Sequence, residues 1–249
     1  MSQPLRVLIT GASRGIGSAI ATQLLEEGHF VALCARTESD LTEIAQKFAD
    51  RALVIPIDVL ALDAAEKAIN QITAKWAGID ALVLNAGDGV SAPIEKTTDE
   101  MWQHMMDLNA TAPFRFLRAA VPHLKADGGS IVVIASKAGL VGEPNVVAYT
   151  AAKHAVVGLV RAAAAELGKY KIRVNALCPD YVDTPMTQRT LSAAAERTGK
   201  SVADVKMALV TKLTGLRLLT AQEVASAAIT MLQDAEMTGF ARLLEGENI

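Results

Sequence analysis

Tyr149 and Lys153 are the residues of this 249-residue chain whose types and spacing best suit proton transfer. On a helix, positions i and i+4 lie on the same face, so a phenol and an ammonium would be neighbours. A free tyrosine has a pKa of roughly 10, and an adjacent cation favours the phenolate and lowers that pKa. The pair therefore predicts a general acid or base. Taken alone, such a pair more often consists of a core aromatic beside a solvated lysine, so other residues must decide.

A glycine-rich turn follows the first apolar run of the chain. Residues 5–10, LRVLIT, suit a strand buried on both faces, and GASRGIG at 11–17 leads into a segment with helical spacing. Glycines permit tight curvature, and the free N–H groups at a helix start attract a phosphate. The spacing is G-x-x-x-G-x-G rather than G-x-G-x-x-G. Its position after the first strand favours a nucleotide site over a simple turn.

Arg36 ends the second predicted strand, FVALCA at 30–35. In a dinucleotide-binding fold this residue meets the adenosine ribose, where an acid accepts from the 2′-OH and an arginine accommodates a 2′-phosphate. Arg14 in the glycine turn would hold that phosphate from the other side through charge-assisted bonds. The two arginines therefore predict NADP(H) rather than NAD(H), with two plain surface arginines as the alternative.

Polar residues also end the later apolar runs. Asp58 follows the third run and either reaches an adenine amine or faces solvent, and Asn85 and Gly87 end the fourth. In open α/β sheets, ligands bind outside the carboxyl ends of the strands. Ser136 ends the fifth run, thirteen positions before Tyr149. This spacing lets a strand end and a helix start converge over one pocket.

Asn109 lies in the middle of a segment, residues 98–125, that has helical spacing. It is either a satisfied buried amide or a side chain that bends the helix locally and holds a water.

The composition excludes several classes of protein. Hydrophobic residues make up 51% of the chain and charged residues 20%, so a sizeable core is expected and disorder is not. The formal net charge of −3 provides no basic field for nucleic acid or anionic lipid. No stretch approaches the roughly 20 apolar residues of a membrane span, and the N-terminus enters a strand without a secretory pattern. We therefore expect a cytoplasmic protein.

The cysteines and histidines receive a structural interpretation. Cys34 and Cys178 lie in apolar strand-like runs, as buried thiols do in a reducing compartment. The four histidines are scattered, without metal-ligand spacing among themselves or with the cysteines. We expect no metal site.

Strand-like runs alternate with helical patterns throughout the chain. The seven candidate strands are 5–10, 30–35, 52–58, 80–87, 130–136, 172–179 and 240–244. This alternation predicts one α/β domain over residues 1–249, with a doubly wound (Rossmann) fold and a mainly parallel seven-stranded sheet. The charged stretch 187–213 has turn signals at 199–201, which predict two helices, and its place after a strand end makes it a candidate substrate lid.

The motifs together resemble those of the short-chain dehydrogenase/reductase family. The resemblance runs from about residue 5 to 245 and rests on Thr10 through Gly17, Asn85-Ala86-Gly87, Asn109, Ser136, Tyr149-x-x-x-Lys153, and Pro179 through Thr184. It implies a nicotinamide dinucleotide cofactor and hydride transfer to or from a carbonyl carbon.

The resemblance also implies residue roles. Tyr149 would be the general acid for carbonyl reduction or the base for alcohol oxidation, Ser136 would hydrogen-bond the substrate oxygen, and Lys153 would hold the nicotinamide ribose and lower the pKa of Tyr149. Asn109 would position a water that links Lys153 to solvent. The cofactor-binding residues, besides Tyr149 and Lys153, would be Gly11, Ser13, Arg14, Ile16, Gly17, Arg36, Asp58, Val59, Asn85, Gly87, Pro179, Val182 and Thr184, the last at the nicotinamide carboxamide.

Two departures from the family pattern bear on the substrate and the assembly. Many members have Pro-Gly where this chain has Pro179-Asp180, and an aspartate lacks the backbone range of glycine and adds a carboxylate near the expected pocket. The tail reads LEGENI where many relatives have Val-Asp-Gly-Gly. We expect the C-terminal interface to differ.

Substrate likenesses point in two directions. The segments at 34–37, 149–162 and 176–186 are most similar to ketoreductases that act on 3-oxoacyl or polyketide chains, whereas the stretch 187–213 resembles the lid of 3-hydroxybutyrate dehydrogenases. We expect an NADP(H)-dependent oxidoreductase that interconverts a ketone and a secondary alcohol. The alternatives are an NAD(H)-linked hydroxyacid dehydrogenase and a non-catalytic dinucleotide sensor.

The run that follows Lys153, HAVVGLVRAAAAELG, is almost entirely small and apolar. It predicts a helix that is covered over most of its surface. Because a monomer would expose too much of such a helix, we expect it and the Asn109 helix to pack against copies of themselves. A homotetramer is expected, or a homodimer, with a monomer as the alternative. The other expected partner is a small carbonyl or alcohol substrate.

Overall fold

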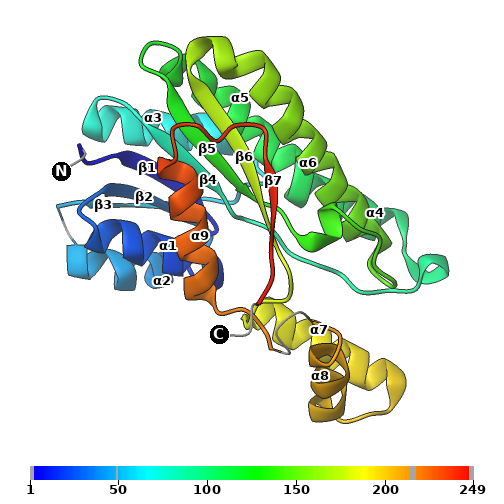
Figure 1. Ribbon diagram of the computed structural model, residues 1–249. Coiled ribbons are helices and arrows are strands. Elements are labelled where there is room, and N and C mark those ends of the chain that lie inside the picture. Colours follow the sequence, from blue (N-terminus) through cyan, green and yellow to red (C-terminus); the bar gives the residue numbers. More distant parts are fainter. Residues whose placement is uncertain (1–2, 49, 214–216, 247–249) are drawn as a thin grey trace.

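Seven strands form one parallel sheet in the computed structural model, which describes residues 3–48, 50–213 and 217–246 (Figure 1). The strand order is β3-β2-β1-β4-β5-β6-β7, and every neighbouring pair runs parallel. The strands are β1 Arg6–Thr10, β2 Phe30–Ala35, β3 Ala52–Pro56, β4 Ala81–Leu84, β5 Gly129–Ile134, β6 Ile172–Pro179 and β7 Ala241–Leu244. The predicted doubly wound fold is confirmed, with a sheet that is wholly rather than mainly parallel.

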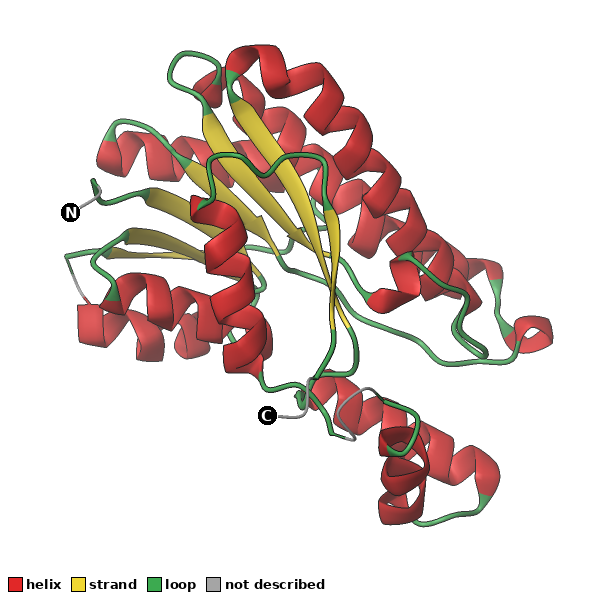
Figure 2. Ribbon diagram, in the orientation of Figure 1, coloured by secondary structure: helices red, strands yellow, loops and turns green. Residues whose placement is uncertain are grey.

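Helices cover both faces of this sheet (Figure 2). One layer contains α1 (Gly15–Glu26), α2 (Glu38–Ala45) and α9 (Ala221–Gln233), and the other contains α3 (Ala64–Trp76), α5 (Ala112–Leu124) and α6 (Val147–Leu167). The shorter α4 (Asp99–Met106) packs against α6. The pair α7 (Pro185–Thr198) and α8 (Val202–Val210) projects away from the sheet (Figure 1).

Alternation of side chains along each strand explains the two buried layers. In β1, Leu8 packs into the α3–α5–α6 layer, whereas Val7 and Ile9 pack into the α1–α2–α9 layer. In β4, Leu82 and Val83 divide in the same way. Because successive side chains of a strand point to opposite faces, a sheet with helices on both sides needs apolar residues at every position. The uninterrupted apolar runs of the sequence follow from this requirement.

The helix predicted over residues 98–125 is interrupted by a wider turn. After α4, a π-helical turn spans Asp107–Thr111, and α5 then begins. The amide Nδ2 of Asn109 donates to Met105 O at 3.1 Å and to Asp88 O at 3.0 Å. This side chain competes for a backbone acceptor of the helix, which accompanies the change in winding. The predicted helix is therefore divided at Asn109 by a local change of winding.

The stretch 187–213 contains two helices, as predicted, with Gly199 between them at a φ of 67°. In the single chain, one side of α6 is exposed, so the expected cover over most of its surface would need further copies of the chain. Four of the seven residues in the exposed stripe of α6 are alanine or glycine. The stripe consists of His154, Ala155, Gly158, Arg161, Ala162, Ala165 and Glu166. The opposite side of α6 is buried against the sheet.

We expect Gly17→Ala to destabilise the fold. A Cβ at this position would overlap Gly11 O and lie 2.5 Å from Asn85 Nδ2. Neither the Gly11 backbone nor the hydrogen-bonded Asn85 amide can move away to make room. The free energy of unfolding, measured by urea denaturation, should fall by about 3 kcal/mol. Gly168→Ala is the matched control, since Gly168 has helical φ and ψ and nothing lies within 4 Å of its added Cβ. Equal stability of the two variants would contradict the prediction.

Candidate active site

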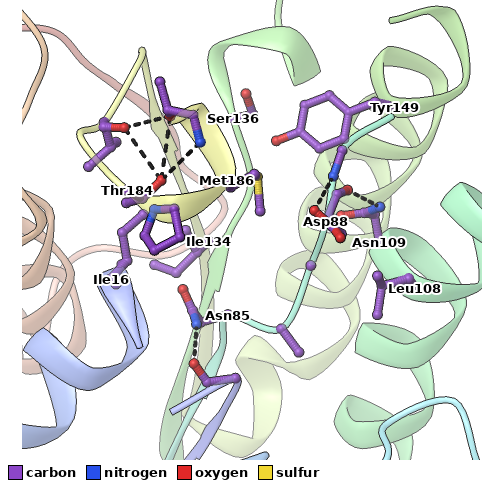
Figure 3. Close-up of a pocket in the computed structure, with 18 of the residues that line it drawn as sticks. Ile16, Asn85, Asp88, Leu108, Asn109, Ile134, Ser136, Tyr149, Thr184 and Met186 are labelled. Carbon is purple, nitrogen blue, oxygen red and sulfur yellow. Dashed lines mark hydrogen bonds between the residues drawn. The ribbon is translucent and has the colours of Figure 1, made fainter. Parts of the chain in front are cut away.

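A cavity of about 390 Å³ opens at the carboxyl ends of the strands. It adjoins the place where β1 lies between β2 and β4 and the order of the strands reverses, which is where open α/β sheets bind ligands. Sixteen of the seventeen predicted site residues line it: Gly11, Ser13, Arg14, Ile16, Arg36, Asp58, Val59, Asn85, Gly87, Asn109, Ser136, Tyr149, Lys153, Pro179, Val182 and Thr184. Figure 3 shows Ile16 and Thr184 on one side and Tyr149 and Asn109 on the other.

Gly17 is the exception, because it does not line the cavity. It is buried in α1 beneath the glycine turn, where its lack of a side chain leaves room for Gly11 O and the Asn85 amide. Gly11 and Gly15 have φ values of 68° and 58°, which favour glycine. No side chain caps α1 and its first turn carries no acid, so its first N–H groups are available to an anion.

Asn85 joins this turn to β4. Its Nδ2 donates to Gly11 O at 3.0 Å and Thr10 O at 3.2 Å, while the Thr10 hydroxyl accepts from the backbone N–H groups of Asn85 and Ala86. The predicted bridging of backbone groups by Asn85 is confirmed. These bonds hold the ends of β1 and β4 in register at the floor of the cavity.

Arg14 and Arg36 line the same cavity, and both are exposed. Arg36 follows the last residue of β2, as predicted. Asp40, which sequence reasoning did not select, also lines the cavity from the first turn of α2. Asp58 lies in the loop after β3, where its Oδ1 accepts from Leu60 N at 3.0 Å. This corner carries both signs of charge.

Ser136, Tyr149 and Lys153 meet where β5 ends and α6 begins. Figure 3 shows the phenol of Tyr149 directed toward Ser136. The Ser136 hydroxyl accepts from Ala138 N at 3.2 Å, so its own proton can be donated elsewhere. Lys153 is buried, and its Nζ donates to Ile134 O at 3.0 Å. A strand end and a helix start therefore converge, as their spacing predicted.

Asn109 lies beside this cluster. Its Oδ1 is buried and has no hydrogen-bond partner among the described residues. A Cβ added at Gly87 would lie 2.8 Å from this oxygen and 3.6 Å from Lys153 Nζ. An unpartnered acceptor so close to a buried ammonium is suited to a bridging water.

The expectation that Lys153 lowers the pKa of Tyr149 is wrong for this structure. Desolvation raises the pKa of Tyr149 to about 12, and the nearby Ser136 hydroxyl opposes this shift only in part. Lys153 donates to a backbone carbonyl instead, and burial lowers its own pKa to about 8. Tyr149 is therefore protonated at neutral pH, which is the form that can donate a proton.

Asp180, the departure from the family's Pro-Gly, forms an ion pair beside the cluster. Its Oδ2 lies 2.8 Å from Lys137 Nζ, which also lies 3.1 Å from Glu245 Oε1. Lys137 directly follows Ser136, so both departures from the family pattern meet at one residue. The last three residues of the unusual tail lie outside the described residues. In the sequence, the sign of this ion pair was the basic residue Lys137 directly after Ser136.

Thr184 begins the lid segment. Its hydroxyl accepts from Thr187 N at 3.4 Å and caps α7. Val182 forms an isolated parallel bridge with Leu219. These contacts connect the cavity wall after β6 to the helices of the lid.

The donor set matches a dinucleotide better than a metal. Within residues 3–48, 50–213 and 217–246, no cluster of three or more histidine, cysteine or acidic side chains is placed to hold a metal ion. No helix among these residues is both long and apolar enough to cross a membrane. The glycine turn, the open start of α1 and the unpartnered Asn109 Oδ1 fit a nicotinamide dinucleotide.

Comparison with known proteins agrees with this fold and site. Residues 6–195 match the family model described as short chain dehydrogenase. The chain is 32% identical over 243 residues to a D-beta-hydroxybutyrate dehydrogenase of Rhizobium meliloti strain 1021. This alignment covers 93% of each of the two chains. It is 38% identical over 188 residues to a putative ketoacyl reductase of a monensin polyketide synthase from Streptomyces virginiae, covering 73% of this chain and 72% of that one.

A solved structure of NAD+-bound xylitol dehydrogenase superposes with a TM-score of 0.91 at 28% identity, over 97% of this chain and 98% of that one. The protein belongs to the short-chain dehydrogenase/reductase family. It is an oxidoreductase of the class that acts on alcohols and ketones, and its likeness to ketoacyl reductases is confirmed.

We expect Lys153→Met to stabilise the protein at neutral pH. The folded-state pKa of Lys153, about 8, is below its ordinary 10.5, so between these values the unfolded chain binds more protons. In the wild type, burial of this charge therefore lowers the free energy of unfolding by its full amount below pH 8. This loss shrinks as the pH rises to 10.5. At pH 7 the variant should gain roughly 3 kcal/mol in free energy of unfolding, and the gain should shrink by pH 10.

Chemical denaturation at pH 7, 8.5 and 10 measures this difference. Lys96→Met is the control, because Lys96 is exposed. A Lys153→Met variant that is less stable than the wild type at pH 7 would contradict the prediction.

Proposed function

We propose that the protein is an NADP(H)-dependent carbonyl reductase, related to those that act on 3-oxoacyl chains, which interconverts a ketone and a secondary alcohol. The observation that carries this proposal is the Tyr149 phenol beside Ser136 in a cavity that the glycine turn at the start of α1 also lines. The bound cofactor would supply or accept the hydride. The chain itself would supply the proton and the donors that stabilise a developing alkoxide.

The proposed roles follow from the hydrogen bonds. Ser136 would donate its free proton to the substrate oxygen, because the serine oxygen already accepts from Ala138 N. Tyr149 would transfer its proton to the same oxygen as negative charge develops there. Lys153 would use its remaining N–H donors to bind the hydroxyls of the nicotinamide ribose while its bond to Ile134 O holds it in place. Asn109 would hold the water that returns a proton to Lys153.

Tyr149→Phe tests the proposal. This variant should bind NADPH as the wild type does and reduce ketones about 100- to 10,000-fold more slowly, because it lacks the transferable proton. The measurement is loss of NADPH absorbance with a panel of linear and cyclic ketones and 3-oxoacyl esters. Tyr170→Phe is the matched control, since Tyr170 lies at the far end of α6, against Lys125 and Lys169. Unchanged turnover by Tyr149→Phe would overturn the proposed mechanism.

The preference for NADP(H) over NAD(H) rests on Arg36 and Arg14, which line the adenosine corner of the cavity. The xylitol dehydrogenase structure was solved with NAD+, so the fold also accepts that cofactor. Arg36→Asp should shift the ratio of kcat/KM for NADPH and NADH toward NADH by about 10- to 100-fold, because a charge-assisted bond becomes a repulsion. Arg36→Leu separates loss of the cation from gain of the carboxylate. Equal use of both cofactors by the wild type would contradict this assignment.

An NAD(H)-linked hydroxyacid dehydrogenase is the second candidate, favoured by the hydroxybutyrate dehydrogenase relative that aligns over nearly the whole chain. A dinucleotide sensor without activity is disfavoured, because the structure brings Ser136, Tyr149 and Lys153 together. NADPH binding without turnover of any ketone in the panel would favour the sensor.

We also propose that α7 and α8, which include most of residues 187–213, act as a substrate lid in a single catalytic domain. Arg189 of α7 lies 2.8 Å from Asp88 Oδ1, in the loop after β4. Both side chains are half-exposed, and an exposed ion pair is weak enough to break and re-form.

For the assembly, we propose a homotetramer in the cytoplasm. The smooth outer stripe of α6 and the exposed Trp102 and Phe114, each 42% exposed, support packing against further copies. Two buried free cysteines, Cys34 and Cys178, agree with a reducing compartment.

A further inference from the structure

The substrate end of the cavity carries charges of both signs. Its wall includes Asp88, Glu143 and Asp180, against the bases Lys137 and Arg189. Arg189 pairs with Asp88 at 2.8 Å, and Lys137 is shared between Asp180 and Glu245. Both bases are thus already committed to acids of the protein. Lys153, which donates to Ile134 O, and His104 on α4 are the other titratable side chains of this wall apart from the tyrosines, Tyr149 and Tyr181.

Glu143 differs from the other acids because its partner is neutral. Within the described part of the chain, its carboxylate has one hydrogen-bond partner, the Tyr181 hydroxyl, which donates to Oε2 at 3.2 Å. A carboxylate accepts up to about four hydrogen bonds, so Glu143 retains acceptor capacity toward the cavity that it lines.

Glu143 shares its surroundings with the reacting groups. It lies in the loop between Ser136 and Tyr149, and it is half-buried. Burial raises the pKa of the Glu143 carboxyl, and the Glu143 charge in turn helps to raise the pKa of Tyr149. The Glu143 carboxylate is therefore close enough to the Tyr149 phenol for its charge to act on the reacting group.

We propose that Glu143, held by Tyr181, is a specificity-determining residue that accepts a hydrogen bond from a hydroxyl group of the substrate, so that the preferred substrates are neutral hydroxylated ketones and the corresponding diols. This inference rests on the proposed ketone reduction. Glu143 disfavours substrate carboxylates in two ways. Its own charge repels them, and the two neighbouring bases would have to leave Asp180, Glu245 or Asp88 to bind one.

A matched four-carbon series tests this specificity. It consists of 4-hydroxy-2-butanone and 1-hydroxy-2-butanone, their deoxy analogue 2-butanone, and the carboxylate 3-oxobutyrate. The wild type should favour the better hydroxyketone over 2-butanone by about 10- to 100-fold in kcat/KM, as a hydrogen bond to a charged group allows. It should reduce 3-oxobutyrate more slowly than 2-butanone.

Glu143→Gln keeps the shape of the side chain and removes its charge. The preference for the hydroxyketone should fall to about 3-fold or less, mainly through a higher KM, and the KM for 3-oxobutyrate should fall. Tyr181→Phe, which frees the carboxylate, should weaken the same preference in part and serves if Glu143→Gln does not fold. Glu236→Gln, at an exposed acid away from the cavity, should change neither ratio.

The outcomes separate the two proposals. No turnover of any ketone here or in the wider panel would overturn the proposed function. Turnover of 2-butanone with no preference for either hydroxyketone would overturn the role of Glu143 alone. Efficient reduction of 3-oxobutyrate that is unaffected by Glu143→Gln would do the same and would indicate that Lys137 or Arg189 binds the carboxylate.

Discussion

The site depends on the hydrogen bond that the buried ammonium of Lys153 donates to Ile134 O. A charge without water is costly unless it is hydrogen-bonded, and here the partner is the carbonyl of Ile134, the last residue of β5. That bond ties the first turns of α6 to the end of a central strand. Ser136 and Tyr149, which flank the two ends of this connection, are thereby brought to one point of the cavity.

The same constraint connects catalysis to stability. Desolvation lowers the pKa of Lys153 and raises that of Tyr149, so both groups are held closer to their neutral forms than they would be in water. The neutral phenol suits proton donation. The poorly solvated ammonium suits a group that must bind polar oxygens of a ligand.

A second charged system shapes the substrate end. Lys137 brings together Asp180 after β6 and Glu245 after β7, while Arg189 reaches from the lid to Asp88. These pairs join segments that are far apart in the chain. They leave Glu143 with a tyrosine hydroxyl as partner, which gives the pocket a chemical character that its family membership does not specify.

Much of the fold and the site could be predicted from the sequence alone, because both depend on hydrophobic patterns and on spacing between nearby residues. Apolar runs that alternate with helical patterns permit few arrangements other than a parallel sheet between two helical layers. The carboxyl ends of parallel strands meet at one edge, so residues such as Asn85 and Ser136 could be assigned to a common cavity from their places in the runs. The i and i+4 spacing put Tyr149 and Lys153 on one face of α6 whatever the fold.

Tertiary packing decided the rest. Burial relative to distant groups reversed the expected pKa shift of Tyr149, because desolvation cannot be inferred from spacing along a helix. Gly17 lies under the turn and not in the cavity, since its nearest neighbours come from Gly11 and from Asn85 of another strand. The partners of Lys137, Glu143 and Arg189 are 38 to 108 residues away in sequence. Only the folded chain determines which of these charged side chains meet.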